Sequence, residues 1–407
     1  MGYDSLMSHV VIVGAGPAGA SLALLLSSRG VDVTLLERRR DFSREFRGEI
    51  LMPSGMTALE QMGLGTQLPP VPMHRVQSVD VFMNGARIFG LDPRSFENTQ
   101  VNAVSQTALL EMLVDQAGAH NTFRFERGAS LQGFLMDSSR VVGVRAKLEE
   151  GEVEIRADLV VGADGRNSMV RRVFGLKLRH VSPPMDIVWF KVPCPEELDG
   201  ARVYLGRGHL LFAYRTWDGT LQLGWVILKG TFGDLRSRGI DQWLDEMTKH
   251  VSTDLAEHLL AHRSQIGHPF LLDVVSDCVE SWCSPGAVVI GDAAHAMSPV
   301  GAQGINIALR DSVVAANHLV PLLDGSAVEP EALDAALKQI EAERMREVGP
   351  IQSLQARPPK LILSQSWWGE PTRRIFAKLL SSERVRSRAG SQISAFPFGI
   401  TDVKLEV

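Results

Sequence analysis

The N-terminal residues alternate between apolar runs and short breaks. Residues 9–14 are mostly apolar and predict a buried strand, and residues 16–30 predict a helix that ends at Gly30, a residue type common at helix C-termini. Residues 31–37 form another apolar run and predict a second strand. A strand, a helix and a strand in so short a stretch predict two parallel strands joined by a crossover helix.

The same two patterns return further along the chain. Helical spacing of apolar residues predicts helices over 104–119, 304–319 and 329–349. Apolar runs over 157–165 and 286–292 predict two more buried strands, and each run closes on a glycine and an aspartate. Strands that alternate with helices predict an α/β fold with a mainly parallel sheet.

Two stretches carry a different pattern. Residues 79–90 place an Asn-Gly pair at 84–85 between apolar flanks, and residues 209–228 place an Asp-Gly pair at 218–219 in the same setting. Such pairs favour the tight turns of β-hairpins. Because these antiparallel pieces interrupt the parallel elements, we expect one second domain assembled from two insertions.

Composition narrows the class of protein. With 407 residues, of which 45% are hydrophobic and 22% charged, the chain suits a globular protein of two or three domains. The formal charge of −5 gives no general attraction to nucleic acid. Cys194, Cys278 and Cys283 form neither a metal-binding spacing nor a disulfide framework, so we expect no metal site and a reducing, cytoplasmic location.

One apolar stretch, residues 10–26, resembles a signal peptide. The region before it contains Asp4 and no lysine or arginine, so the positive segment of a signal peptide is missing. The stretch is 17 residues long and contains three glycines and a proline, which makes it a poor membrane span. No other run approaches that length, so we expect no integral membrane segment.

The turn after the first strand carries the strongest chemical signal. Gly14, Gly16 and Gly19 form a GxGxxG fingerprint between a predicted strand and a predicted helix. The first glycine permits a tight turn, the second lets the backbone approach a pyrophosphate, and the third lets the helix pack on the strand. Glu37 closes the next strand and can accept a hydrogen bond from a ribose hydroxyl. The motif predicts a dinucleotide site but does not distinguish NAD from FAD.

Two aspartates follow later strands. Asp164 and Asp292 each stand just past a buried run. Because parallel strands place their C-terminal ends at one edge, we expect both carboxylates beside the dinucleotide turn, where a long ligand with several hydroxyl groups would suit them. Each aspartate could instead cap a helix, since Ser168 and Arg171 follow Asp164 at helical spacing.

The loop over 299–306 leads into the helix predicted from residue 304. Gly301 and Gly304 permit unusual backbone angles and a close approach. The helix N-terminus would attract an anion, and phosphate is already assigned to the GxGxxG turn. A reduced isoalloxazine ring carries its negative charge near N1 and O2. We therefore expect this helix end to stabilise reduced flavin.

These segments together resemble a known family. The GxGxxG turn with Glu37, the Asp-Gly turn at 164–165 and the stretch GDAAHAMSPVGAQGIN over 291–306 occur in the order and spacing of the single-component FAD-dependent aromatic hydroxylases, of the para-hydroxybenzoate hydroxylase type. The segment REFRGE at 44–49 resembles the arginine-containing FAD segment of that family. Residues 105–113 are similar to its flavin-contacting helix.

The resemblance spans about residues 9–350 and implies roles for individual residues. It implies that FAD contacts the following positions: Gly14, Ala15, Gly16, Ala18, Gly19, Glu37, Arg38, Arg47, Gln106, Asp164, Asp292, Gly304, Ile305 and Asn306. Asp164 would also serve transient NAD(P)H. Pro299 would lie beside the flavin where oxygen reacts, and Arg47 is the second residue with an expected catalytic role. His295 is expected to be structural, because no acid–base partner is visible for it.

The chemistry of the family needs one dinucleotide fingerprint rather than two. NAD(P)H docks briefly, reduces FAD and leaves, and the reduced flavin adds oxygen as a C4a-hydroperoxide that attacks an electron-rich ring or alkene. The resemblance thus implies a monooxygenase that uses NAD(P)H and O2 to hydroxylate or epoxidise a small aromatic or polyketide-like substrate.

Candidate substrate residues come from the second hairpin. Phe212, Tyr214 and Trp225 would line the pocket, and Arg215 would meet an acidic substrate. Strand alternation places Phe212 and Tyr214 on one face of the sheet. Ordinary sheet packing is the simpler explanation for each of these residues.

Three other functions stay open at this point. A flavin-dependent halogenase is the nearest enzyme alternative, but residues 224–230 lack that family's second tryptophan and its proline. A flavin reductase of the geranylgeranyl-reductase type would avoid oxygen. A non-catalytic relative would use the flavin fold to bind a protein or lipid.

The resemblance also implies the architecture. We expect a Rossmann-like FAD-binding domain of the glutathione reductase type, with an inserted antiparallel-sheet substrate domain and a C-terminal helical segment. The expected boundaries are 1–74, 101–178 and 268–345 for the FAD-binding domain, 75–100 and 179–267 for the substrate domain, and 346–407 for the C-terminal segment.

Overall fold

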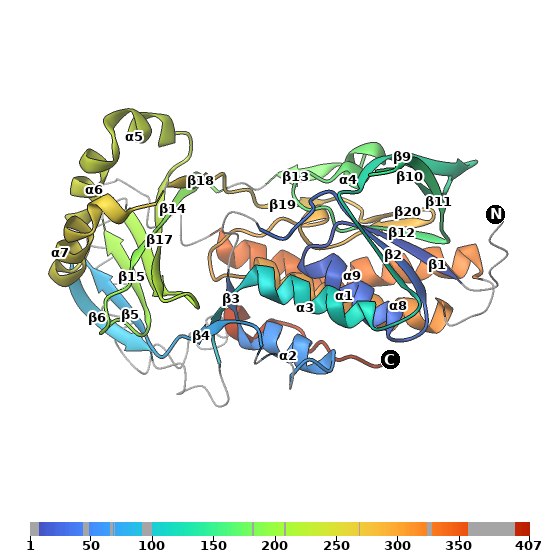
Figure 1. Ribbon diagram of the computed structural model, residues 1–407, viewed down its shortest axis with the longest axis horizontal. Coiled ribbons are helices and arrows are strands. Elements are labelled where there is room, and N and C mark those ends of the chain that lie inside the picture. The colour runs from blue at the N-terminus through green and yellow to red at the C-terminus, as the bar shows by residue number, and fades with distance from the viewer. Residues whose placement is uncertain are drawn as a thin grey trace.

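The computed structural model places two bodies side by side along the long axis of the molecule (Figure 1). The larger body contains a mainly parallel sheet and the long helices, and the smaller body contains a second sheet with three short helices on its outer side. The structure describes residues 8–43, 49–65, 68, 70–91, 100–180, 183–206, 209–267, 269–323, 328–356 and 395–407.

A six-stranded sheet forms the centre of the larger body. Its strands follow the order β20-β21-β12-β1-β2-β8. They are β1 (His9–Val13), β2 (Asp32–Glu37), β8 (Phe123–Arg127), β12 (Leu159–Gly162), β20 (Cys283–Ser284) and β21 (Ala287–Val289). All neighbours are parallel except β20 and β21. The inner strands are buried on both faces, which explains their continuous apolar runs.

Two layers cover this sheet. The helical layer consists of α1 (Pro17–Ser27), α3 (Gln106–Gly118), α8 (Gly304–Leu323) and α9 (Pro330–Gln355). The opposite layer is an antiparallel sheet of β9 (Ser130–Asp137), β10 (Arg140–Leu148) and β11 (Gly151–Arg156). The expected Rossmann-like α/β fold is therefore confirmed, and it collects the C-terminal ends of β1, β2, β12 and β21 at one edge.

The smaller body carries a seven-stranded sheet in the order β18-β14-β17-β16-β15-β5-β6. Its strands are β5 (Val79–Met83), β6 (Ala86–Leu91), β14 (Met185–Pro193), β15 (Ala201–Gly206), β16 (His209–Arg215), β17 (Thr220–Leu228) and β18 (Phe270–Leu272). The two insertions thus form one sheet, and the hairpins β5–β6 and β16–β17 are confirmed. β5 and β15 pair in parallel, so the sheet is mixed rather than wholly antiparallel. A long connection, not a hairpin, joins these two strands, which leaves their relative direction free.

Three helices cover the outer face of this second sheet. They are α5 (Phe232–Arg238), α6 (Ile240–Thr248) and α7 (Thr253–Ala261). Trp225 and Trp243 belong to the apolar cluster between these helices and the sheet. A different cluster lies on the inner face, where Tyr214 packs with Ile50 and Val300 from the larger body. One face of the sheet therefore packs on its own helices, and the other face packs against the larger body.

Several element boundaries differ from the sequence predictions. The first helix ends at Ser27, because the amide of Gly30 donates to the carbonyl oxygen of Ser27 (3.1 Å) in a turn with a positive φ of 80° at the glycine. The sequence patterns did not predict the strands β9–β11 or the helices α5–α7. Of the helices that the structure describes, none has the length and apolar character needed to cross a membrane. The domain boundaries stay a prediction.

Side chains from α8 and α9 form a buried network of charges. Arg344 is fully buried and donates to Asp311 Oδ1 and to Glu347 Oε2, each at 2.7 Å. Arg310 donates to both oxygens of Glu347, at 2.7 and 3.0 Å. His295 Nε2 lies 2.7 Å from Asp311 Oδ2. The network ties α8 to α9 and to the segment that follows β21.

The last residues of the chain pack on the larger body. The amide of Ile400 donates to Glu347 Oε1 (3.0 Å), so the terminal segment joins the buried network. We expected a helical segment over 346–407; α9 accounts for its beginning, and residues 357–394 lie outside the described part of the chain. One further helical turn occupies residues 395–398.

Candidate functional site

The turn after β1 is packed too tightly for any side chain at its first glycine. Gly14 has a positive φ of 103°, and a Cβ built on it would lie 2.5 Å from the carbonyl oxygen of Ala163. A Cβ on Gly19 would lie 1.9 Å from the carbonyl oxygen of Gly14. These two glycines let β1, α1 and the turn after β12 approach one another, so their role lies within the fold.

Gly16 has a different environment. It is the N-cap of α1, it provides no side-chain cap, and a Cβ built on it would meet nothing within 4 Å. Pro17 occupies the first helical position, which leaves the amides of Ala18 and Gly19 at the open helix end. An open helix N-terminus with free space beside its cap suits the pyrophosphate of a dinucleotide.

Glu37 ends β2 next to this turn. Its side chain is buried, and its two carboxylate oxygens accept the amides of Ala15 and Arg39, each at 3.0 Å. A carboxylate at the end of β2, beside the GxGxxG turn, is placed where the ribose of a bound dinucleotide would lie. Arg38, the next expected cofactor residue, is exposed.

Asp164 follows β12 and caps a helix. Its Oδ2 accepts the amides of Met169 (2.6 Å) and Val170 (3.3 Å) at the start of α4 (Met169–Val173), with the Ser168 side chain as a second cap. The capping alternative is therefore correct for this oxygen. Oδ1 is buried and has no hydrogen-bond partner among the described residues, which leaves one oxygen for a cofactor. Its contact with FAD and NAD(P)H stays a prediction.

Asp292 lies in the neighbouring turn, after β21. Its Oδ2 is 3.8 Å from the Nε of Arg166, which follows the Asp164 turn. The structure therefore places the two aspartate turns next to each other, as parallel pairing of β12 and β21 requires.

The loop before α8 has an unusual backbone. Gly301 and Ala302 both adopt positive φ angles, of 74° and 53°. A Cβ on Gly304 would meet nothing within 4 Å, so space surrounds the start of α8. The carbonyl oxygen of Pro299 accepts the amide of Ala302 (3.0 Å), which holds the loop as a turn. Left-handed geometry at a residue other than glycine is strained and often marks a functional site.

The side chain of Asn306 has a structural task. It accepts the amide of Met52 (2.9 Å) and donates to the carbonyl oxygens of Ile50 (3.2 Å) and Ala302 (2.7 Å). It thereby fixes β3 (Ile50–Leu51) to the start of α8. Ile305 beside it is buried. The contact of Asn306 with FAD stays a prediction.

The starts of α1 and α8 meet at one turn. A Cβ built on Gly291 would lie 2.9 Å from the Cβ of Ala18 and 3.9 Å from the Cβ of Ala308. Gly291 therefore lies between the first turn of α1 and the second turn of α8. Three distant sequence segments converge here, and the open N-terminus at Gly16, the carboxylate of Glu37 and the open start of α8 fit a nucleotide that carries a flavin.

Two expected residues give less information. Gln106 is the first residue of α3 and is half-buried. Arg47 lies outside the residues that the structure describes. Both roles stay predictions.

The expectation that His295 has no acid–base partner is wrong. Its Nε2 lies 2.7 Å from Asp311, and both side chains are buried, at 1% and 0% exposure. Because the pair is enclosed by α8 and α9, it has no route to a substrate. The reason to regard His295 as structural is therefore the burial of the pair, and not the lack of a partner.

Comparison with known proteins identifies the family. Residues 7–347 match the family described as an FAD binding domain. Over 355 residues the chain is 31% identical to the 6-methylpretetramide 4-monooxygenase of Streptomyces rimosus, and the alignment covers 86% of this chain and 84% of that protein. The chain belongs to this family of FAD-dependent monooxygenases. The recognition of the family from sequence and the assignment of FAD are thereby confirmed.

This monooxygenase also resembles two further known proteins. It is 26% identical over 396 residues to the rifampicin monooxygenase of Streptomyces venezuelae, which covers 96% of this chain and 79% of that protein. The crystal structure of p-nitrophenol 4-monooxygenase PnpA from Pseudomonas putida DLL-E4 has a TM-score of 0.79 at 17% identity, over 96% of this chain and 99% of that one. The latter likeness shows a shared fold.

The inner face of the second sheet turns aromatic side chains toward the flavin-binding body of the monooxygenase. Phe212 and Tyr214 lie on this face together, as strand alternation predicts. The ring of Phe212 lies over Gly224, where any Cβ would come within 2.3 Å of it, and it meets Trp189 edge-on at 5.0 Å between centroids. Val300, from the loop before α8, belongs to the same cluster.

Trp225 and Arg215 do not belong to this face. Trp225 packs against Trp243 under α6, with ring centroids 5.8 Å apart. Arg215 follows Leu211 and Ala213 in the alternation of β16, and those two residues pack on the outer cluster. Both assignments to the substrate pocket are therefore wrong, because Arg215 alternates with Tyr214 along β16 and Trp225 pairs with Leu211 of that strand.

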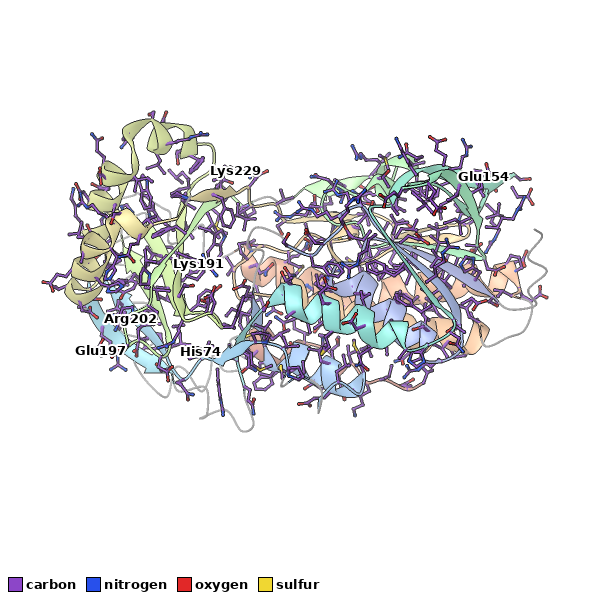
Figure 2. The ribbon with its side chains drawn as sticks, viewed as in Figure 1. His74, Glu154, Lys191, Glu197, Arg202 and Lys229 are labelled. Atoms are coloured by element: carbon purple, nitrogen blue, oxygen red, sulfur yellow. The ribbon has the colours of Figure 1, made fainter. Side chains whose placement is uncertain are left out.

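The sequence reasoning missed a polar group on the inner face. Lys191 lies on the second sheet (Figure 2) and pairs with Asp218 at 3.0 Å. Burial raises the pKa of Glu49 to about 7, and the charge of Lys191 offsets this only in part. Burial and the charge of Glu49 hold the pKa of Tyr214 well above its usual range. Glu49 had been treated as part of the FAD segment, and no pattern in the sequence marks it as a pocket residue.

Proposed function

We propose that this FAD-dependent monooxygenase hydroxylates a planar aromatic substrate of the phenol or polyketide class between the second sheet and the loop before α8. The observation that carries the proposal is the shared cluster of Phe212, Tyr214 and Trp189 from the sheet with Ile50 and Val300 from the larger body. Aromatic walls on one side and a flavin loop on the other suit a flat apolar ring. The activity of the Streptomyces rimosus relative on 6-methylpretetramide supports the polyketide class.

The cofactor positions follow from the edge geometry. The start of α1 beside Gly16 would hold the pyrophosphate, and Glu37 would accept from ribose hydroxyls. The start of α8 at Gly304 and Ile305 would face the flavin, with Asp164 and Asp292 along the path between. When bound by these residues, FAD would supply the redox chemistry, namely hydride acceptance from NAD(P)H and activation of O2.

The protein's own contribution is to exclude water and control protons. Tyr214 is buried within the inner cluster, which keeps the reacting face dry. Glu49 interacts electrostatically with Lys191, with Asp218 and with the phenol of Tyr214, and a pKa of about 7 leaves its carboxyl group about half protonated at neutral pH. We propose that Glu49 exchanges this proton with the substrate hydroxyl, because a pKa near 7 suits transfer in either direction.

The reaction is proposed to take place in the cytoplasm. Cys194, Cys278 and Cys283 are free thiols, which suits a reducing compartment. NAD(P)H is supplied there.

Oxygen labelling tests the proposed function. Incubation of the holoenzyme with NAD(P)H, 18O2 and a panel of phenols and polyketide aromatics is expected to give one product whose mass rises by a single labelled oxygen atom. Peroxide must be measured in parallel, because some ligands trigger NAD(P)H oxidation without oxygen transfer. A panel that yields only peroxide, or bromination when bromide is supplied, would contradict the proposal.

Glu49→Gln tests the proton-holding role through stability. The folded state raises the pKa of Glu49 from 4.5 to about 7, so the native protein binds this proton more tightly and loses stability as pH rises from about 4.5 to 7. The variant removes this loss, and we expect it to gain up to about 3 kcal/mol at pH 8 and nothing at pH 4. Denaturant unfolding at both pH values measures the difference.

The matched control is Glu149→Gln, at a surface carboxylate with 75% side-chain exposure. It should leave stability unchanged at both pH values. Equal effects of the two substitutions would remove the argument for a perturbed Glu49. If Glu49 also serves the reaction, the Glu49→Gln variant loses the pH dependence of kcat near 7.

A further inference from the structure

Two histidines and a glutamate gather on the smaller body, at the end of the sheet near α6. His209 begins β16, Glu246 lies on α6, and His250 follows the end of that helix. One ligand atom from each side chain lies within 4.8 Å of the others. The imidazole rings of His209 and His250 stack with centroids 3.6 Å apart and planes 20° apart. This arrangement places two nitrogen donors and one carboxylate oxygen within 4.8 Å of one another.

The spacing of these atoms suits an ion better than a hydrogen bond. His250 Nε2 lies 3.7 Å from Glu246 Oε1, beyond hydrogen-bonding distance. Two ligand atoms that each lie about 2.1 Å from a tetrahedral zinc ion are about 3.4 Å apart. This is close to the 3.7 Å between His250 Nε2 and Glu246 Oε1. The Nε2 atom is buried and has no hydrogen-bond partner in the part of the chain that the structure describes. Buried polar atoms rarely remain without a partner.

The carboxylate of Glu246 turns one oxygen toward the two histidines. Glu246 Oε2 contacts Lys249 Nζ at 2.8 Å, which leaves Oε1 toward the histidines. The lysine side chain is 66% exposed and can move away without cost to packing.

We propose that His209, Glu246 and His250 bind one divalent transition-metal ion, with Zn2+ the best fit to two imidazoles and a carboxylate. Water would complete the coordination. The ion would join the start of β16 to the end of α6 and so secure the helices that cover the outer face. Because His209 alternates with Leu211 and Ala213, the site lies on the face of the sheet away from Tyr214.

Zinc titration of the holoenzyme tests the proposal. Metal-free protein prepared with a chelator is titrated with Zn2+ by calorimetry and by competition with a fluorescent zinc indicator. We expect one saturable site per chain and a higher unfolding temperature with zinc, because the ion binds the folded state. Glu246→Gln keeps the size of the side chain but removes its charge, and His250→Ala removes a ring. Loss of even an outer partner weakens metal sites about 10–100-fold, so we expect each variant to bind zinc at least 100-fold more weakly.

A second histidine pair supplies the control. His258 and His262 on and after α7 have ring centroids 4.2 Å apart, and no carboxylate forms a metal-type cluster with them among the described residues. His262→Gln should leave the zinc site intact. Zinc affinity equal in Glu246→Gln and the parent, or no saturable binding at 100-fold molar excess of zinc, would overturn the proposal. FAD content and circular dichroism establish that each variant is folded.

Discussion

A Gly16→Val variant is expected to fold and to purify without FAD. The space where the new side chain would lie is open in the protein, since no atom lies within 4 Å of a Cβ on Gly16. That space adjoins the open N-terminus of α1, so valine would occupy the position of the pyrophosphate. We expect FAD affinity to fall by roughly a hundredfold or more, about 3 kcal/mol. The ratio of flavin to protein absorbance after purification measures it.

Two other glycines separate cofactor loss from misfolding. Gly118→Val, at the exposed end of α3, also places a side chain in open space and should keep full FAD. Gly14→Val should fail to fold, because its Cβ would lie 2.5 Å from the carbonyl oxygen of Ala163 at a φ that valine avoids. A Gly16→Val protein that purifies fully yellow would refute the placement of the pyrophosphate.

Arg344→Met is expected to destabilise the protein by about 3–5 kcal/mol. Arg344 is fully buried between Asp311 and Glu347, and its loss leaves two buried carboxylates short of a partner. Denaturant unfolding at saturating FAD measures the effect. Arg140→Met is the matched control: its 2.8 Å pair with Asp334 is partly exposed, and such pairs contribute about 1 kcal/mol or less.

The pH dependence of this loss has a defined sign. Burial opposes ionisation of Asp311, but the charges of His295 and Arg344 outweigh it and lower the pKa of Asp311. A carboxylate with a lowered pKa adds stability above its unfolded pKa and loses it as pH falls. The difference between the parent and Arg344→Met should therefore shrink toward low pH. A difference that grows toward low pH would contradict this account of the network.

The dinucleotide edge could be predicted from sequence because its requirements act on single residues. Only glycine fits at position 14, and only a hydrogen-bond acceptor suits position 37 at the end of β2. Each constraint therefore fixes the residue type at one position of a motif with constant spacing. The roles of Asn306 and Asp164 in holding distant segments together were harder to predict from the sequence. Polar side chains can brace a loop or contact a cofactor, and spacing alone does not separate these roles.

The substrate face was only half predictable. Alternation along β16 grouped Phe212 with Tyr214 but could not say which side of the sheet faces the flavin. Trp225 was assigned by its chemistry and lies on the other side, because its neighbour in β16 is Leu211 and not Phe212. Glu49 gave no signal, since its raised pKa comes from the burial that both bodies create together.

The parallel pairing of β5 with β15 constrains how the chain is made. About 110 residues separate the end of β6 at Leu91 from the start of β15 at Ala201. At ribosomal rates of about 5–20 residues per second, the first hairpin emerges roughly 5–20 seconds before the strand that it pairs with. During that interval β5 presents an unpaired strand edge on the nascent chain. Such an edge can bind chaperones or pair with another chain and aggregate.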